Sequence, residues 1–236
     1  MPTNRATILL TRPQEQAERF ARMCRDMLGA EQQIILSPLI KIEMLPMQES
    51  LAHYCGLIFT SENGVRAFAQ AYGQHDMSAY CVGERTAQAA HAAGLRAYSA
   101  NGSADDLVAM VKGADVRGAL LHIRGEHSRG DIAGRLGQQV DEVVAYRQVS
   151  VPLSEEAREI LAGEHKVILP LFSPRTAQLF FTQDLQINAS LQVVAISNAV
   201  NEAILGTNLA KSIDIFIAET PDAEAMLRTI KRRIDT

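Results

Sequence analysis

Residues 120–147 read LLHIRGEHSRGDIAGRLGQQVDEVVAYR, and the organisation of the chain follows from this stretch. Its apolar start predicts a buried strand, and the glycine- and arginine-rich segment predicts a turn. An amphipathic helix and a second strand ending at Tyr146 are predicted to follow. Arg124, Arg129 and Tyr146 are the side chains in it that are least suited to packing.

On both sides of this stretch, predicted strands continue to alternate with predicted helices. Thr11 is expected to cap the first helix and Thr220 the last, and serines are expected to cap four others (Ser61, Ser103, Ser154 and Ser173). Residues 33–45 form a longer extended stretch, in which Pro38 favours an edge strand or a connector over a central strand. Strands that alternate with helices indicate mostly parallel, doubly wound α/β sheets. Short strands are predicted at 7–10, 57–59, 80–82, 97–99, 167–172, 193–196 and 213–217.

Composition narrows the classes of function. The 236 residues are 47% hydrophobic and 21% charged, and they are enough for one large or two modest globular domains. Aromatic residues make up 5% with no Trp, and the net charge is −4, so nucleic-acid binding is disfavoured. No apolar run has the length of a membrane span, and the first residues do not resemble a secretory signal. Three widely spaced cysteines fit reduced thiols in the cytoplasm.

The two halves of the chain resemble each other. Ser61 corresponds to Ser173 and Arg12 to Arg124, and both pairs are 112 positions apart (173 − 61 and 124 − 12). This correspondence predicts two similar α/β domains that arose by duplication. The alternative is that any two α/β units look alike at this level of similarity.

Two such domains would form a cleft, which is a common place for a ligand. Polar turns follow the predicted strands, at the carboxyl ends where open α/β sheets bind ligands. Each turn begins a helix, and the free N–H groups and the dipole at a helix N-terminus attract anions. The alternative is that the serines and threonines of these turns serve only as helix caps.

Several cofactor motifs are missing from the sequence. There is no GxGxxG after a strand, no GxxxxGK[ST] and no GxSxG. The six histidines are scattered; His122 is interpreted as a core residue, and His127 is a weak candidate for proton transfer. We therefore expect no metal and no cofactor.

Seven segments, in order along nearly the whole chain, resemble the uroporphyrinogen-III synthase family. They are LLTRP (9–13), FTSENGV (59–65), VGERTA (82–87), GSADDL (102–107), RGE (124–126), VAYR (144–147) and FSPRTA (172–177).

The resemblance implies two flavodoxin-like, doubly wound parallel-sheet domains joined by a two-stranded connector. On this pattern the first domain comprises 1–36 plus 152–236 and the second comprises 47–142, with connectors at 37–46 and 143–151. Each half of the chain would then give its first strand–helix–strand piece to the other half's sheet.

The resemblance also implies a cofactor-free reaction of porphyrin and heme biosynthesis. Hydroxymethylbilane, a linear tetrapyrrole with eight carboxylates, would lose its terminal hydroxyl and close to uroporphyrinogen III with the last ring inverted. Capping turns and arginines suit such an anion even at a net charge of −4, because the electrostatic field close to the site decides whether an anion binds. A cytoplasmic monomer with a transient contact to the preceding pathway enzyme is expected.

Site residues follow from the matching segments. Tyr146 would assist departure of the hydroxyl, and Thr86 would contact the substrate. Substrate carboxylates would bind Ser61, Asn63, Ser173 and Arg175, whereas Arg12 and Arg124 would be either ligands or members of structural ion pairs. The family's IGxxTA-like turn reads ISNAVN at 196–201, so Ser197 or Asn198 would have to substitute there.

A different class of function also fits the repeat. The chain could be a cytoplasmic two-domain binding or sensor protein for a small anionic ligand. The segments at 82–87 and 144–147 favour the enzyme over this alternative.

Overall fold

The computed structural model describes residues 6–100, 102–114, 116–127, 130–137, 140–207 and 213–235, so Arg129 lies outside the described residues. The strands are β1 (Thr7–Leu10), β2 (Ile34–Leu36), β3 (Ile40–Met44), β4 (Tyr54–Phe59), β5 (Ser78–Cys81), β6 (Arg96–Ser99), β7 (Ala119–Gly125), β8 (Val140–Ser150), β9 (Lys166–Leu171), β10 (Ser190–Ala195) and β11 (Asp214–Ile217). The helices are α1 (Gln14–Leu28), α2 (Glu62–Tyr72), α3 (Glu84–Ala92), α4 (Ala104–Gly113), α5 (Ile132–Leu136), α6 (Glu155–Ala162), α7 (Pro174–Phe181), α8 (Asn198–Leu205) and α9 (Ala223–Ile234), with a 3-10 turn at Leu51–His53.

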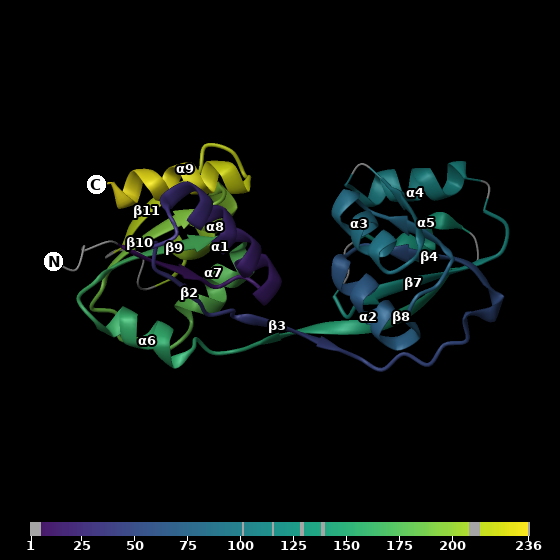
Figure 1. Ribbon diagram of the computed structural model, residues 1–236, viewed down its shortest axis with the longest axis horizontal. Helices are drawn as coiled ribbons and strands as arrows, with labels where there is room; N and C mark the ends of the chain where they lie inside the picture. Colours follow the sequence, from purple (N-terminus) through teal and green to yellow (C-terminus); the bar gives the residue numbers. More distant parts are fainter. Residues whose placement is uncertain are drawn as a thin grey trace. The chain divides into compact units, whose positions relative to one another are not determined.

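The chain divides into two compact units. Unit 1 comprises Met1–Lys41 and Val149–Thr236, and unit 2 comprises Ile42–Gln148. The chain therefore starts in unit 1, forms unit 2 and returns, as the colours of Figure 1 show. Both crossings fall within the segments 37–46 and 143–151.

The sheets of the two units share one strand order. In unit 1 the order is β11-β10-β9-β1-β2, and every pair is parallel. This is the flavodoxin-like order 2-1-3-4-5. In unit 2 the order is β3-β8-β7-β4-β5-β6; apart from the additional edge strand β3, it matches when β7 and β8 take the places of β1 and β2. The predicted fold class is thus confirmed, and each half of the chain gives its first strand–helix–strand piece to the other half's sheet.

The strands β3 and β8 pair where the chain passes between the units. The Leu45 N–H donates to the Ala145 carbonyl at 2.9 Å, and the Val151 N–H donates to the Leu39 carbonyl at 3.1 Å, so the two segments run antiparallel. β8 consequently continues to Ser150, and the expected end of this strand at Tyr146 is wrong. Backbone groups beyond Tyr146 remain in the strand because β3 provides partners for them.

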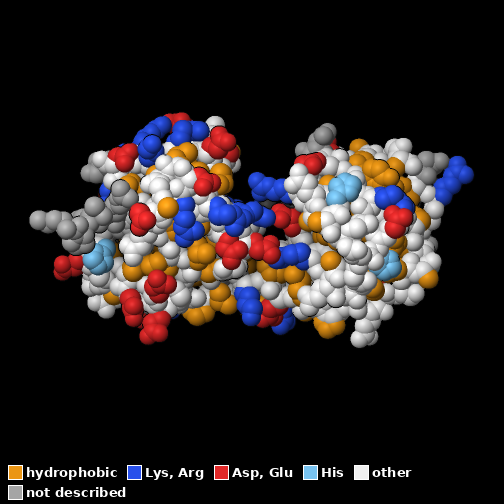
Figure 2. All heavy atoms as spheres, in the orientation of Figure 1, with side chains coloured by type: hydrophobic (Ala, Val, Ile, Leu, Met, Phe, Trp, Pro, Cys, Tyr) orange, Lys and Arg blue, Asp and Glu red, His pale blue; other side chains and the backbone are white. Residues whose placement is uncertain are grey.

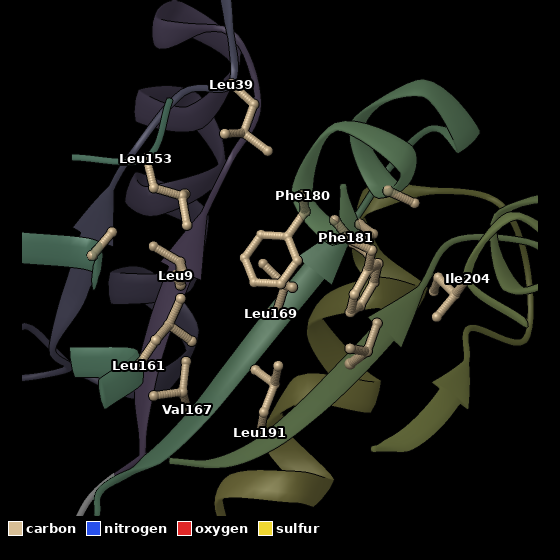
Figure 3. Packing of buried hydrophobic residues seen from close by; sticks show 14 of the residues in the cluster. Leu9, Leu39, Leu153, Leu161, Val167, Leu169, Phe180, Phe181, Leu191 and Ile204 are labelled. Atoms are coloured by element: carbon tan, nitrogen blue, oxygen red, sulfur yellow. The ribbon is translucent and has the colours of Figure 1, made fainter. Parts of the chain in front are cut away.

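Each sheet carries apolar side chains on both faces, as a doubly wound fold requires. Successive residues of a strand point to opposite faces. Leu9 therefore packs into one cluster with α6, α7 and α8, whereas Ile8 and Leu10 pack into another with α1 and α9. Figure 3 shows the first cluster gathered beside Phe180 and Phe181 of α7.

Serine side chains begin several of the helices. The hydroxyl groups of Ser61, Ser103, Ser154 and Ser173 accept hydrogen bonds from backbone N–H groups in the first turns of α2, α4, α6 and α7.

Neither Thr11 nor Thr220 caps a helix, so both of these predictions are wrong. α1 begins after Pro13 without a side-chain cap, and the Asp222 carboxylate caps α9. Thr11 instead lies directly after β1, where its carbonyl accepts a hydrogen bond from the Leu39 N–H at 3.1 Å.

Two neighbouring residues of α8 provide a test of the core. Ile204 is fully buried in the cluster of Figure 3, and Leu205 is 58% exposed. We expect Ile204→Ala to lower the free energy of unfolding by about 2–5 kcal/mol, because it removes buried methyl groups and leaves a cavity. Leu205→Ala should change it by less than about 0.5 kcal/mol. Urea denaturation followed by circular dichroism measures both, and equal losses would contradict this packing.

Candidate active site

In unit 2, five predicted site residues lie on four adjacent strands or just after them, level with the carboxyl end of β7. Thr86 follows β5 and is buried, and Ser61 and Asn63 follow β4. Arg124 is the penultimate residue of β7, and Tyr146 lies opposite the end of β7 on β8. The strands are parallel and adjacent, so these residues share the edge of the sheet where α/β folds bind ligands.

Unit 1 has an equivalent row of turns. Arg12 follows β1, Ser173 and Arg175 follow β9, and Ser197 follows β10. These three strands are also adjacent and parallel. The turns correspond pairwise to those after β7, β4 and β5, as the repeat requires.

Tyr146 is buried, with 8% of its surface exposed. Its ring lies against Gly125, the residue opposite it on β7. Among the described residues, no hydrogen bond to the Tyr146 hydroxyl is present. The Tyr146 hydroxyl is not among the buried side-chain atoms that lack a partner, so the ring is buried while the hydroxyl is open to a ligand.

Arg124 is held by neighbouring groups. Its Nε donates to Oε2 of Glu142 at 3.0 Å, and its Nη1 donates to the carbonyl of Gly125 at 3.0 Å and of Glu126 at 3.3 Å. The other carboxylate oxygen of Glu142 accepts from Nδ1 of His122 at 2.8 Å. This geometry favours the ion-pair interpretation of Arg124. Glu142 was not identified from the sequence, because only the β7–β8 register brings it beside His122.

The helices at these edges differ in whether a side chain accepts hydrogen bonds from the backbone N–H groups of the first turn. Ser61 of α2 and its counterpart Ser173 of α7 accept from backbone N–H groups, so these two serines do act as caps. Gly83 at α3 and Ser197 at α8 make no side-chain capping bond. The helix-cap explanation therefore accounts for the first two turns and does not account for the turns of α3 and α8.

Thr86 and Thr176 occupy the same place in two similar turns. Both lie in the sequence RTAQ, at 85–88 and 175–178, and both threonines are 5% exposed. The Thr176 hydroxyl lies 2.9 Å from the Ser173 hydroxyl. Gly83 offers no such group to Thr86. The repeated RTAQ can be seen in the sequence. Aligning its two copies shows that one helix begins with Ser173 and the other with Gly83.

Arg12 and Asn63 have side-chain contacts within their own units. The Arg12 guanidinium lies 3.9 Å from the ring centroid of Phe172, and its Nη2 donates to Gln16 at 3.4 Å. The Asn63 amide oxygen accepts from Arg66 at 2.6 Å.

Lys and Arg side chains are interspersed with Asp and Glu on the face shown in Figure 2. Attraction of an anion therefore depends on local groups such as open helix ends and individual arginines. In the described ranges, no helix is long and apolar enough to cross a membrane. The same ranges contain no group of three or more His, Cys, Asp and Glu residues placed to hold a metal ion.

His122 makes stability depend on pH. Burial lowers the pKa of His122 below its usual value of about 6.5, and the nearby Glu142 only partly offsets this. Since the unfolded chain binds this proton more readily, its contribution to stability is complete above pH 6.5 and declines as the pH falls toward the folded-state pKa. We expect His122→Asn to flatten the fall in the free energy of unfolding between pH 7 and 5. His127→Asn, at an exposed position, is the control, and equal slopes in wild type and His122→Asn would contradict the assignment.

Both the sequence and the fold were found to be similar to those of known proteins. The sequence model of the family described as "Uroporphyrinogen-III synthase HemD" matches residues 26–228. The fold is similar to a uroporphyrinogen-III synthetase from Helicobacter pylori, with a TM-score of 0.64, 16% identity, and coverage of 97% of this chain and 99% of that one. It is also similar to a mutant uroporphyrinogen III synthase from the extremely thermophilic bacterium Thermus thermophilus, with a TM-score of 0.53, 16% identity and coverage of 98% and 99%. No curated protein sequence gives a significant match.

Proposed function

Since the chain belongs to the uroporphyrinogen-III synthase family, which cyclises hydroxymethylbilane to uroporphyrinogen III, we propose that Tyr146 assists departure of the substrate's terminal hydroxyl. The observation that carries this proposal is the buried ring with a hydroxyl that no described residue engages. A phenol so placed can donate a hydrogen bond or a proton to a leaving group without first losing a protein partner.

The chemical step that Tyr146 assists is breakage of a carbon–oxygen bond. The proton passes to the departing oxygen, water leaves, and an azafulvene cation remains on the tetrapyrrole. The last ring attacks this cation through its substituted α-carbon, which gives a spiro intermediate. The bond from that carbon to its original methylene bridge then breaks, the free α-carbon of the ring bonds to the released bridge carbon, and loss of a proton restores the aromatic pyrrole with the last ring inverted. Because linear hydroxymethylbilane also closes spontaneously without inversion, holding the substrate in one conformation contributes alongside proton transfer.

The turns at the carboxyl ends of both sheets are proposed to bind the substrate's carboxylates. The open N–H groups at the starts of α3 and α8 support this for Thr86 and Ser197, since such groups are well suited to anions. Ser173, Arg175 and Arg12 are proposed to contribute from unit 1.

In unit 2, Ser61 and Asn63 are the corresponding proposed ligands. The bonds of Arg124 to Glu142 and to two backbone carbonyls support a structural task for Arg124 rather than direct contact with substrate.

We also propose that the protein acts as a monomer in the cytoplasm and receives its unstable substrate in transient contact with the preceding pathway enzyme. The cysteines Cys24, Cys55 and Cys81 are unpaired, which fits a reducing compartment.

The type of isomer formed tests the function. Enzymatically generated hydroxymethylbilane would be supplied to the folded protein, and the products would be separated after oxidation to porphyrins. We expect the type III isomer, because an inverted last ring requires a bound intermediate. A binding or sensor protein would leave only the spontaneous type I product, and that result would overturn the proposed function.

Tyr146→Phe tests the proposed acid. We expect kcat to fall by at least about tenfold, toward the range seen for general acids, while the free energy of unfolding changes little because no hydrogen bond is lost. Tyr72→Phe is the matched control. The Tyr72 hydroxyl donates to the Glu49 carbonyl at 3.0 Å, so this change should cost about 1 kcal/mol of stability and leave kcat intact. An unchanged kcat in Tyr146→Phe would remove Tyr146 from the mechanism.

A further inference from the structure

Strand β8 is irregular immediately before Tyr146. Arg124 pairs with Val144, but the next residue of β7, Gly125, pairs with Tyr146, so Ala145 is an extra residue in β8. Ala145 and Tyr146 are consecutive, and both are buried. Both faces of this sheet are covered, so their burial fits side chains on opposite faces, and the extra residue changes which side chain of β8 lies beside Gly125. A bulge of this kind redirects the side chain that follows it.

Gly125 lies under the ring of Tyr146. A Cβ atom at Gly125 would lie 2.8 Å from Cε2 and Cζ of the ring and 3.0 Å from the hydroxyl oxygen. Gly125 is not among the glycines with a positive φ angle, so its backbone conformation does not require glycine. The reason for glycine at this position is therefore the close approach of the aromatic ring.

Arg124 fixes the segment that carries Gly125. Its Nη1 binds the carbonyls of Gly125 and Glu126, and its Nε binds Glu142 of β8. The Glu126 N–H donates to the Tyr146 carbonyl at 2.9 Å. The end of β7 is thus tied to β8 through its backbone on one side and through the guanidinium on the other.

We propose that Gly125 is a positioning residue that sets the place of the Tyr146 hydroxyl, with Arg124 holding Gly125 in place. This inference rests on the proposed role of Tyr146 in the reaction. Gly125 does not touch the reacting atoms. It acts by allowing the ring to lie directly on the backbone of β7, which a larger residue would prevent.

Gly125→Ala is the direct test. We expect kcat for type III formation to fall at least about tenfold with a smaller change in KM, because the hydroxyl is displaced while the carboxylate-binding turns stay in place. Gly113→Ala is the matched control in the same unit. Apart from its chain neighbours and the backbone of α4, no described atom lies within 4 Å of a Cβ at Gly113, so this variant should keep wild-type activity.

A double-mutant cycle separates positioning from general damage. If Gly125→Ala acts through Tyr146, it should cost less than about twofold in kcat when introduced into Tyr146→Phe. Losses that multiply in the double variant would overturn the inference, because they would show that Gly125 acts independently of the hydroxyl.

Fluorine NMR gives a readout that does not depend on activity. The chain contains five tyrosines, so labelling with 3-fluorotyrosine allows the Tyr146 resonance to be assigned by its loss in Tyr146→Phe. We expect this resonance to shift in Gly125→Ala and to stay unchanged in Gly113→Ala. A full rate in Tyr146→Phe would refute the catalytic role alone, whereas an unmoved resonance in Gly125→Ala would refute the positioning.

Arg124→Met provides a second variant in case Gly125→Ala does not fold. It removes the guanidinium donors and keeps most of the side-chain length. We expect the Tyr146 resonance to shift or broaden, because the end of β7 loses its attachment to Glu142 and to its own carbonyls. A resonance identical to wild type would overturn the role assigned to Arg124.

Discussion

Both sheets depend on parallel pairing between strands that come from opposite halves of the chain. β1 pairs with β9 in unit 1, and β4 pairs with β7 in unit 2. These strands lie inside the sheets, with β1 between β9 and β2 and with β7 between β4 and β8. Their side chains are buried on both faces, as with Leu9 on one face and Ile8 and Leu10 on the other. Neither half of the chain can complete a doubly wound sheet without the other half.

This exchange also explains why the candidate site has pseudo-symmetry. Duplicated pieces bring equivalent turns to equivalent places, with Ser61 matching Ser173 and the open end of α3 matching that of α8. The symmetry ends at Tyr146. The corresponding strand in unit 1 is β2, which ends at Leu36. Repeated turns fit the proposed binding of a substrate with repeated carboxylates, and a hydroxyl without a counterpart fits the proposed loss of one hydroxyl from that substrate.

Features that depend on local sequence could be predicted. The alternation of strands and helices, the serine caps at Ser61, Ser103, Ser154 and Ser173, and the edge position of the segment around Pro38 follow from local chemistry. The family resemblance then identified the exchange of strands, which periodicity alone does not reveal.

Features that depend on distant partners could not be predicted. Thr11 is a residue type that often caps a helix, yet its carbonyl binds the Leu39 N–H just beyond the end of β1. The β8 bulge and the Glu142 bridge between His122 and Arg124 depend on the register with β7. The importance of Gly125 appears only when the Tyr146 ring is seen to lie on it.

The strand exchange sets an order for folding during synthesis. Unit 2 is one continuous segment, Ile42–Gln148, and it can fold as soon as it leaves the ribosome. β1 and β2 are made first but must wait for β9, which belongs to the last segment, Val149–Thr236. β9 ends 161 residues after β1 (171 − 10), so at about 5–20 residues per second roughly 8–32 s of synthesis separate the two strands. Throughout this interval the apolar strand Thr7–Leu10 lacks β9, one of its two sheet partners, and its edge stays open to wrong pairing.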